Sequence, residues 1–325
     1  MHNVFDLQTH QDRIYQFYLA NEVWIRHQVN LRNTDLKNNN KPKIILGLFD
    51  VISKDILYSN GDDVLLVEHI IQDHRQISKS LIEIPRSIYG IYYMPDAVWH
   101  RDIQKDFNCF INRNDPIRQS WFYLLYHRGL LDHAYASFSG HSRMSDIGLE
   151  LFDQIHHSTL SSFDSIYQDI RQIIPYKNFT ETGDLCDTIM STKFSVIIET
   201  YFERSDAITF SEKTFRALQT PRPWLLFHAT GAVKQLRDMG FYVYDDIIDH
   251  SYDTVDTIVD SVSRQESILD QTKKLVSMKV TESMLDHWEK MTKQNCEILR
   301  DLNSKWRNDV LTCINDSYKI ALSKI

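Results

Sequence analysis

The chain has 325 residues, 42% hydrophobic and 25% charged, which is the composition of a globular protein long enough for two domains of ordinary size. Thirty-six basic and 44 acidic residues give a net charge of −8, so no overall positive field draws the protein onto nucleic acid or a membrane, although a local basic patch is compatible with this balance. No run approaches the ~20 apolar residues of a membrane-spanning helix and the N-terminus lacks a signal-peptide pattern, so we expect no membrane span and a cytoplasmic location.

The first third of the chain has the pattern of an α/β unit. Residues 4–29 place aromatic and aliphatic side chains among polar ones and predict one or two amphipathic helices. Three short apolar runs then predict buried strands at 44–49, 64–67 and 88–94. The first of these strands ends at Asp50 and the second at Glu68. We place an N-terminal domain at residues 1–105, because the polar and charged stretch 96–105 is typical of a domain boundary.

A second α/β unit begins after this boundary. Its first elements are a strand at 107–111, an outgoing loop at 112–116, a periodic helix at 117–131 and a strand at 135–138. The loop carries Arg113, and the start of the helix carries Arg118. The planar fork of an arginine suits bidentate recognition of a phosphate, and the alternative for either residue is an exposed charge at a helix start. We favour Arg113, because it lies in the loop.

Residues 194–231 are the most informative stretch. The predicted elements are a strand at 194–198, a polar loop at 203–207, a helix that ends before Pro221, and a strand at 224–227 that leads through Gly231 into another helix. Thr209 and Glu212 have the T-x-x-E spacing of a capping box, which predicts that the first helix starts near Thr209. In an open parallel sheet, ligands bind where such loops leave the carboxyl ends of the strands.

The first turn of this helix contains Glu212 and Lys213. Free backbone N–H groups and the helix dipole attract anions there, and a lysine adds positive charge, so the position suits a diphosphate. A carboxylate nearby is suited to accept the hydroxyl groups of a ribose. The alternative is that Glu212 completes the capping box and Lys213 is a solvated surface charge.

Three further segments complete the chain. Residues 141–193 have helical patterns and a polar loop, and we predict an insertion there within a C-terminal domain at 106–260. Residues 245–253 are dense in aspartates, but their spacing fits neither an EF-hand nor a D-x-D pair, so we favour a polar loop or helix start over a metal site. Residues 261–325 predict a tail of long amphipathic helices.

The segment around the predicted diphosphate site also resembles a known protein family. Glu199, the segment 210–215 (FSEKTF) and the segment 223–227 (PWLLF) resemble the donor-binding motif of α1,3-fucosyltransferase-like glycosyltransferases. In that family a strand ending in Phe-Glu-Asn-Ser is followed by Tyr-x-Thr-Glu-Lys and then by Pro-Val-Val-Leu-Gly. This chain has Thr200 at the Asn position and Ser211 at the Thr position, and the resemblance extends over roughly residues 106–253.

The resemblance implies a GT-B glycosyltransferase, in which two Rossmann-like domains face a cleft and a helical C-terminal tail packs in part on the N-terminal domain. It implies a nucleoside-diphosphate sugar, linked to UDP or GDP, as the donor, and no cofactor or metal beyond it. The implied donor-binding residues are Arg113 or Arg118, Glu199, Ser211, Glu212 and Lys213. The reaction is expected to be inverting, with an N-terminal carboxylate as general base. Glu68 is the first candidate, because the segment that it begins loosely resembles the family segment that starts with the base glutamate, and Asp50 is the second.

The acceptor is left open by the sequence. The family usually acts on glycans, whereas some GT-B enzymes of phage or viral type act on hydroxymethylated pyrimidines in DNA. The net charge of −8 weighs against DNA without excluding it, since phosphate contacts require no more than a local basic patch. The alternative from another class is a catalytically inactive nucleotide-sugar-binding or scaffold protein of the same fold.

Overall fold

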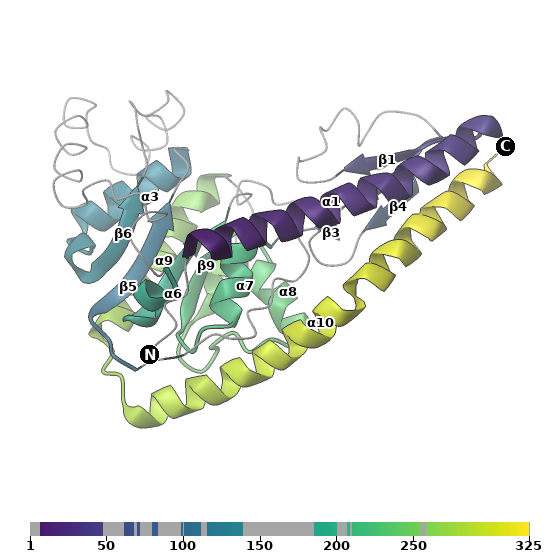
Figure 1. Cartoon of the computed structure of the whole chain (residues 1–325). Helices are drawn as coiled ribbons and strands as arrows, with labels where there is room; N and C mark the ends of the chain where they lie inside the picture. The colour runs from purple at the N-terminus through teal and green to yellow at the C-terminus, as the bar shows by residue number, and fades with distance from the viewer. Residues whose placement is uncertain are drawn as a thin grey trace.

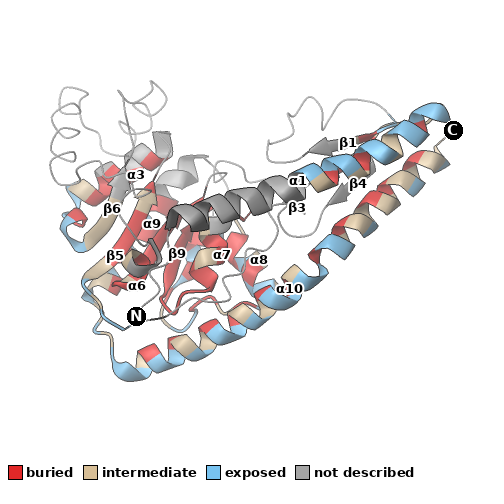
Figure 2. Cartoon of the chain, viewed as in Figure 1, coloured by how far each residue is buried: buried red, intermediate tan, exposed pale blue. Residues whose placement is uncertain are grey.

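The computed structural model describes residues 7–47, 62–67, 70–71, 80–83, 99, 101–111, 116–138, 185–199, 207–208, 210–254 and 258–324. Figure 1 shows a broad body around a parallel sheet and a narrow arm formed by two long helices and a smaller sheet. Buried residues fill the body, and the long C-terminal helix exposes its outer side along most of its length (Figure 2). No helix within the described ranges is long and apolar enough to cross a membrane.

The body is organised by a sheet whose strands all run parallel, in the spatial order β6-β5-β7-β9. The strands are β5 (Lys105–Ile111), β6 (Ala134–Phe138), β7 (Thr192–Ile198) and β9 (Trp224–Phe227). The chain passes from β5 to β6 on one side and then returns to place β7 on the other side of β5. The order therefore reverses between β5 and β7, and such a switch point is where doubly wound sheets bind ligands.

Helices cover this sheet and complete its core. They are α3 (Pro116–His127), α6 (Leu185–Met190), α7 (Glu212–Leu218), α8 (Ala232–Asp238) and α9 (Ile258–Ser277). All four residues of β9 are buried, which is the pattern of a parallel strand covered on both faces. Phe107 of β5 and Phe194 of β7 stack with ring centroids 5.3 Å apart, so the two strands that flank the switch point are also joined through their side chains.

The arm contains a second parallel sheet, in the order β1-β2-β4. Its strands are β1 (Ile44–Gly47), β2 (Val64–Val67) and β4 (Ser80–Glu83), and the helices beside it are α1 (Leu7–Asn38) and α10 (Glu282–Ser323). Arg32 donates from Nη2 to Asn315 Oδ1 (2.7 Å), and the Tyr318 hydroxyl donates to the Asp35 carboxylate. Both pairs are separated by 283 positions, so α1 and α10 run parallel.

Helix α10 connects two separate hydrophobic cores. Its 42 residues correspond to a length of ~63 Å at 1.5 Å per residue. The first half contributes Leu285, Trp288, Leu299 and Leu302 to the core of the body. The second half contributes Trp306, Val310, Ile314 and Ala321 to the core of the arm, where they pack with residues of α1, β1 and β2.

A short antiparallel pairing joins the two parts at another point. Strand β3 (Ile70–Ile71) follows β2 in the sequence, and strand β8 (Ala207–Ile208) precedes α7. Ile70 pairs with Ile208, and Ile71 pairs with Ala207. The pairing places the chain that leaves the arm sheet beside the chain that enters the first turn of α7.

The α/β class with a parallel sheet and a C-terminal helix is confirmed. The strands predicted at 107–111, 135–138, 194–198 and 224–227 correspond to β5, β6, β7 and β9. Strand β7 begins at Thr192, two residues before the predicted start at Phe194, and β4 was not predicted. The strand predicted at 88–94 lies outside the described residues. The three described strands of the arm contain no reversal of order, so they do not by themselves establish a second Rossmann-like domain.

Candidate functional site

The switch point of the sheet brings together residues from two separate segments. Glu199 directly follows β7, and Arg118 lies in the first turn of α3, the helix that follows β5. Arg118 is 3% exposed, and its Nη2 donates to the backbone carbonyl oxygen of Glu199 at 2.9 Å. The guanidinium therefore links the carboxyl end of β7 to the start of α3. Its burial makes it a residue that positions the strand end, rather than a charge presented to solvent.

The carboxylate of Glu199 ties β7 to the start of α7. Its Oε1 accepts from the Ser211 backbone N–H (3.1 Å) and from the Thr214 hydroxyl (2.5 Å), and its Oε2 accepts from the Ser211 hydroxyl (2.5 Å). Glu199 is 1% exposed. Three hydrogen bonds, each strengthened by the charge, offset the cost of burying a carboxylate. The Glu199 carboxylate is thus already part of the fold.

Ser211 is the N-cap of α7, so the predicted helix start near Thr209 is two residues early. Its backbone is extended, and its Oγ accepts from the Lys213 backbone N–H at 3.3 Å. The Lys213 ammonium group also donates to this Oγ, at 3.3 Å. Ser211 takes the cap because its hydroxyl and its backbone N–H both bind Glu199. The half-buried Lys213 ammonium lies beside the cap.

Four of the predicted donor-binding residues therefore form one connected group: Arg118, Glu199, Ser211 and Lys213. Thr214 also belongs to it, and no pattern in the sequence singled this residue out. Glu212 begins α7, and its side chain lies outside the described part of the structure. Arg113 and both candidate bases, Asp50 and Glu68, also lie outside it.

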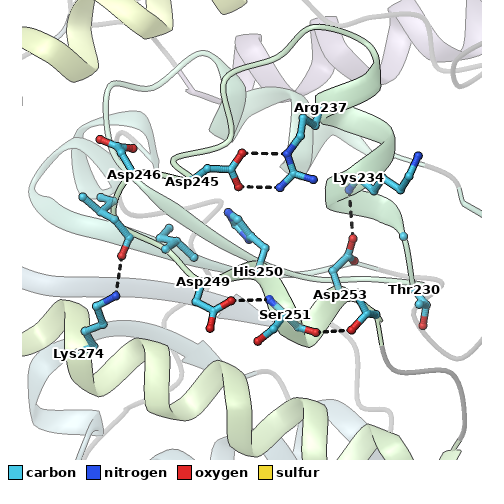
Figure 3. Close-up of a pocket in the computed structure, with 14 residues that line it drawn as sticks. Thr230, Lys234, Arg237, Asp245, Asp246, Asp249, His250, Ser251, Asp253 and Lys274 are labelled. Carbon is cyan, nitrogen blue, oxygen red and sulfur yellow. Dashed lines mark hydrogen bonds and ion pairs between the residues drawn. The ribbon is translucent and has the colours of Figure 1, made fainter.

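A pocket of about 840 Å³ lies at the end of β9, and none of the residues of this group lines it. Its walls come from α8, from the segment 245–254 and from Lys274 of α9 (Figure 3). Arg237 forms a bidentate pair with Asp245, with N–O distances of 2.6 and 2.8 Å, and this guanidinium holds the pKa of Asp245 below its usual range. Lys274 Nζ donates to the Ile247 carbonyl oxygen at 3.0 Å. The acidic stretch predicted as a polar loop or helix start thus forms turns and a short 3-10 helix, η3 (His250–Thr254).

Asp253 is the most buried acidic group of this pocket, at 5% exposure. Its Oδ2 accepts from the Lys234 backbone N–H (3.1 Å), and its backbone carbonyl accepts from Gly231 N–H (2.9 Å). Its Oδ1 has no hydrogen-bond partner among the described residues. Burial raises the pKa of Asp253 to about 6, although the hydrogen bonds from the backbone N–H groups of Lys234, Val233 and Ala232 act in the opposite direction.

His250, at the floor of the pocket, has a fixed tautomer. Its Nε2 lies 2.6 Å from the Val243 carbonyl oxygen, which accepts hydrogen bonds and cannot donate them, so Nε2 carries the proton. Its Nδ1 therefore accepts from the Tyr252 hydroxyl at 2.9 Å, and that hydroxyl in turn accepts from Leu226 N–H at 3.2 Å. Burial lowers the pKa of His250, against the effect of the Val243 hydrogen bond. The ring is neutral and structural.

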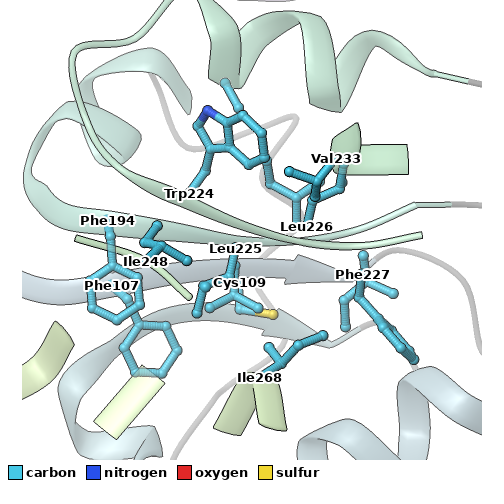
Figure 4. Packing of buried hydrophobic residues seen from close by; sticks show 14 of the residues in the cluster. Phe107, Cys109, Phe194, Trp224, Leu225, Leu226, Phe227, Val233, Ile248 and Ile268 are labelled. Carbon is cyan, nitrogen blue, oxygen red and sulfur yellow. The ribbon is translucent and has the colours of Figure 1, made fainter. Parts of the chain in front are cut away.

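The packing around β9 fixes the walls of the pocket (Figure 4). On one side of the strand, Trp224 and Leu226 of β9 lie with Val233 of α8. On the other side, Leu225 and Phe227 of β9 lie with Ile268 of α9. Arg264 of α9 lies over the Phe227 ring at 5.2 Å and donates to the carbonyl oxygens of His228 and Tyr252 at 2.5 and 3.0 Å. Both walls are therefore anchored to a fully buried strand.

The two sites differ in chemistry. The switch-point group, formed by Arg118, Glu199, Ser211, Lys213 and Thr214, has one half-buried cation, Lys213. The pocket has paired charges and the buried carboxylate of Asp253. Among the described residues, no group of three or more histidine, cysteine, aspartate or glutamate side chains is placed to hold a metal ion. Comparison of the chain with protein-family models, with curated proteins and with solved structures found no match.

Proposed function

We propose that this protein is a glycosyltransferase of GT-B type that transfers a sugar from a nucleoside-diphosphate sugar to a hydroxyl acceptor. The observation that carries the proposal is the position of the Lys213 ammonium, at the carboxyl edge of a doubly wound parallel sheet and beside its switch point. A site at this edge is the expected place for a nucleotide. The assignment to glycosyl transfer rests on the sequence resemblance and is a fold-level analogy.

Lys213 supplies the charge in this proposal. Its ammonium group donates to the Ser211 hydroxyl, and a diphosphate oxygen would give it a charged acceptor. Positive charge at this point stabilises the negative charge that develops on the departing diphosphate. The sequence has no D-x-D pair, so we propose that cations of the protein carry this role without a metal.

Arg118 and Glu199 act indirectly in this scheme. Both are buried, and together with Ser211 they hold the end of β7 and the start of α7 in a fixed relation. Such support keeps Lys213 in place, which matters because a displacement of ~1 Å in a catalytic site is costly. Arg113 and Glu212 remain proposed donor contacts.

The general base is proposed to come from the N-terminal part. Ile70 pairs with Ile208, three residues before Ser211, and Glu68 precedes Ile70 by two residues in the sequence. The chain next to Glu68 therefore runs beside the chain that leads to the proposed donor site, which supports Glu68 over Asp50. We propose an inverting reaction with a glycan or a hydroxymethylated pyrimidine in DNA as acceptor, in keeping with the resemblance.

A second candidate function is an inactive nucleotide-sugar-binding or scaffold protein. The observation in its favour is that the Glu199 carboxylate and the Lys213 ammonium are both bound to Ser211, so the groups expected at the donor site already serve the fold. The departure from the family motif at Thr200 points the same way.

Donor hydrolysis separates the two candidates. The purified chain is incubated with a panel of UDP- and GDP-sugars, and the release of nucleoside diphosphate is followed with a coupled assay. An active transferase releases UDP or GDP slowly without an acceptor, and Lys213→Ala reduces this rate, whereas the matched Lys273→Ala variant on the exposed side of α9 does not. Binding without any release supports the inactive protein, and neither binding nor release contradicts both.

A further inference from the structure

Helix α7 is held at its two ends by different parts of the chain. At its end, the Trp99 indole N–H donates to the Gln219 carbonyl oxygen at 3.2 Å. Two residues after Trp99, Arg101 binds three carboxylates in the first turns of α10, so this contact belongs to the body (Glu282, Asp286 and Glu289). Ahead of the start of α7, Ile208 of β8 pairs with Ile70 of β3, a strand that follows β2 of the arm. The end of α7 is thus fixed by the body, whereas its start is also tied to the arm.

The β3–β8 pairing connects the arm core to the start of α7 through two short stretches of chain. Strand β2, which packs with α10 in the arm core, ends at Val67, three residues before Ile70. Three residues of chain span at most ~11 Å, so the position of β2 limits that of β3. On the other side of the pairing, Ile208 lies three residues before Ser211, the N-cap of α7. A displacement of the arm core would therefore reach the cap within a few residues.

The pairing is short enough to open while the two cores stay folded. It consists of two residue pairs, Ile70 with Ile208 and Ile71 with Ala207, and a two-stranded pairing of this kind is marginally stable in water. The Ile208 side chain is 4% exposed and belongs to the core of the body, so the body holds this residue through its side chain and the arm through its backbone. Helix α7 has seven residues, and a helix of this length depends on its tertiary contacts. Loss of the pairing is therefore expected to loosen its first turn.

Helix α10 is another connection of the arm to the body. Its last residue in the body core is Leu302 and its first in the arm core is Trp306, so residues 303–305 belong to neither. The position of the arm therefore depends on the β3–β8 pairing as well as on the helix. We infer that this pairing is a latch through which the arm regulates the proposed donor site: when closed it holds Ser211 and Lys213 in place, and when open it loosens the first turn of α7. The regulatory role rests on the proposed function, whereas the latch itself does not.

The latch is tested by hydrogen exchange of the full chain, read by mass spectrometry of overlapping peptides. In the double variant Ile70→Pro/Ile71→Pro, β3 loses the backbone N–H groups with which it can pair, because proline has none. We expect residues 211–215 to exchange about tenfold faster than in the wild type, with β9 unchanged. The double variant Ile70→Ala/Ile71→Ala keeps these N–H groups and is the matched control, in which residues 211–215 are expected to exchange as in the wild type.

A second measurement needs no substitution and remains valid if the proline variant fails to fold. In the wild type at increasing urea concentrations, residues 211–215 are expected to lose their protection together with β2 of the arm and before β9 of the body. The inference is overturned if the proline variant exchanges as the alanine variant does at these residues, or if they stay protected until β9 opens. Neither measurement includes a nucleotide, so a failure of donor binding would contradict the proposed function and leave the latch standing.

Discussion

The substitution Glu199→Gln tests how the switch-point group is held together. The carboxylate accepts three hydrogen bonds in a site where it is 1% exposed. Glutamine keeps one acceptor oxygen for the Ser211 N–H and the Thr214 hydroxyl. Its amide N–H₂ group, however, faces the Ser211 hydroxyl, which in the wild type donates to the carboxylate, so two donors then meet. One charge-assisted hydrogen bond, worth about 1.5–3 kcal/mol, is lost, and the two others become neutral. Removal of a buried charge returns part of its desolvation cost. The free energy of unfolding is therefore expected to fall by roughly 2–4 kcal/mol.

Urea unfolding followed by circular dichroism measures this change, and hydrogen exchange of residues 210–219 localises it. Both are useful because two separate cores need not unfold in one step. Asp270→Asn is the control, since its carboxylate makes a 3.4 Å surface pair with Lys273, and it is expected to change stability by less than ~0.5 kcal/mol. If Glu199→Gln is as stable as this control, with unchanged exchange at the start of α7, Glu199 does not hold the site.

Three other predictions concern pH, metal and the base. The pKa of Asp253 is raised from 3.8 in the unfolded chain to about 6, so the stabilisation from its protonated form is full below pH 3.8 and is lost as pH rises through 6. Wild-type stability relative to Asp253→Asn is thus expected to fall by up to roughly 3 kcal/mol between pH 4 and 7, and a constant difference in urea titrations would contradict this. Donor hydrolysis is expected to survive EDTA, and reversible loss on chelation would mean that a metal takes part. Glu68→Gln is expected to lower kcat by ~10²–10⁴ with donor affinity nearly unchanged, and normal turnover in a folded variant would move the assignment to Asp50.

Sequence patterns predicted the elements whose signals are local. The run 224–227 is apolar throughout because β9 is covered on both faces, and Gly231, with φ of 82°, allows the turn into α8. Glu199, Ser211 and Lys213 of the switch-point group were also found, because a strand end and a following helix start are visible in the chain, whereas Thr214 was not. The order of the strands, which makes this edge a switch point, was not visible there.

Three features depend on residues far apart in the sequence and were missed. The start of α7 was misplaced because Ser211 becomes the cap through Glu199, twelve residues earlier. Helix α1 continues to Asn38, beyond the predicted end at Val29, and its last turns bind residues of α10 that lie 283 positions later. The hydrogen bonds of the Asp253 carboxylate depend on how α8 packs against η3. The aspartate-rich stretch therefore predicted a polar loop there, but not the burial of Asp253 or its contact with α8.

The central claim is that a nucleoside diphosphate binds beside Lys213. Isothermal titration calorimetry of UDP and of GDP against the wild-type chain and Lys213→Ala tests it most directly, with Lys273→Ala as the exposed control. One of the two nucleotides is expected to bind the wild type and the control equally. Its affinity for Lys213→Ala is expected to be about 10- to 150-fold weaker, which corresponds to about 1.5–3 kcal/mol for a charge-assisted hydrogen bond. The absence of binding to the wild type, or equal affinity for a folded Lys213→Ala variant, would contradict the claim.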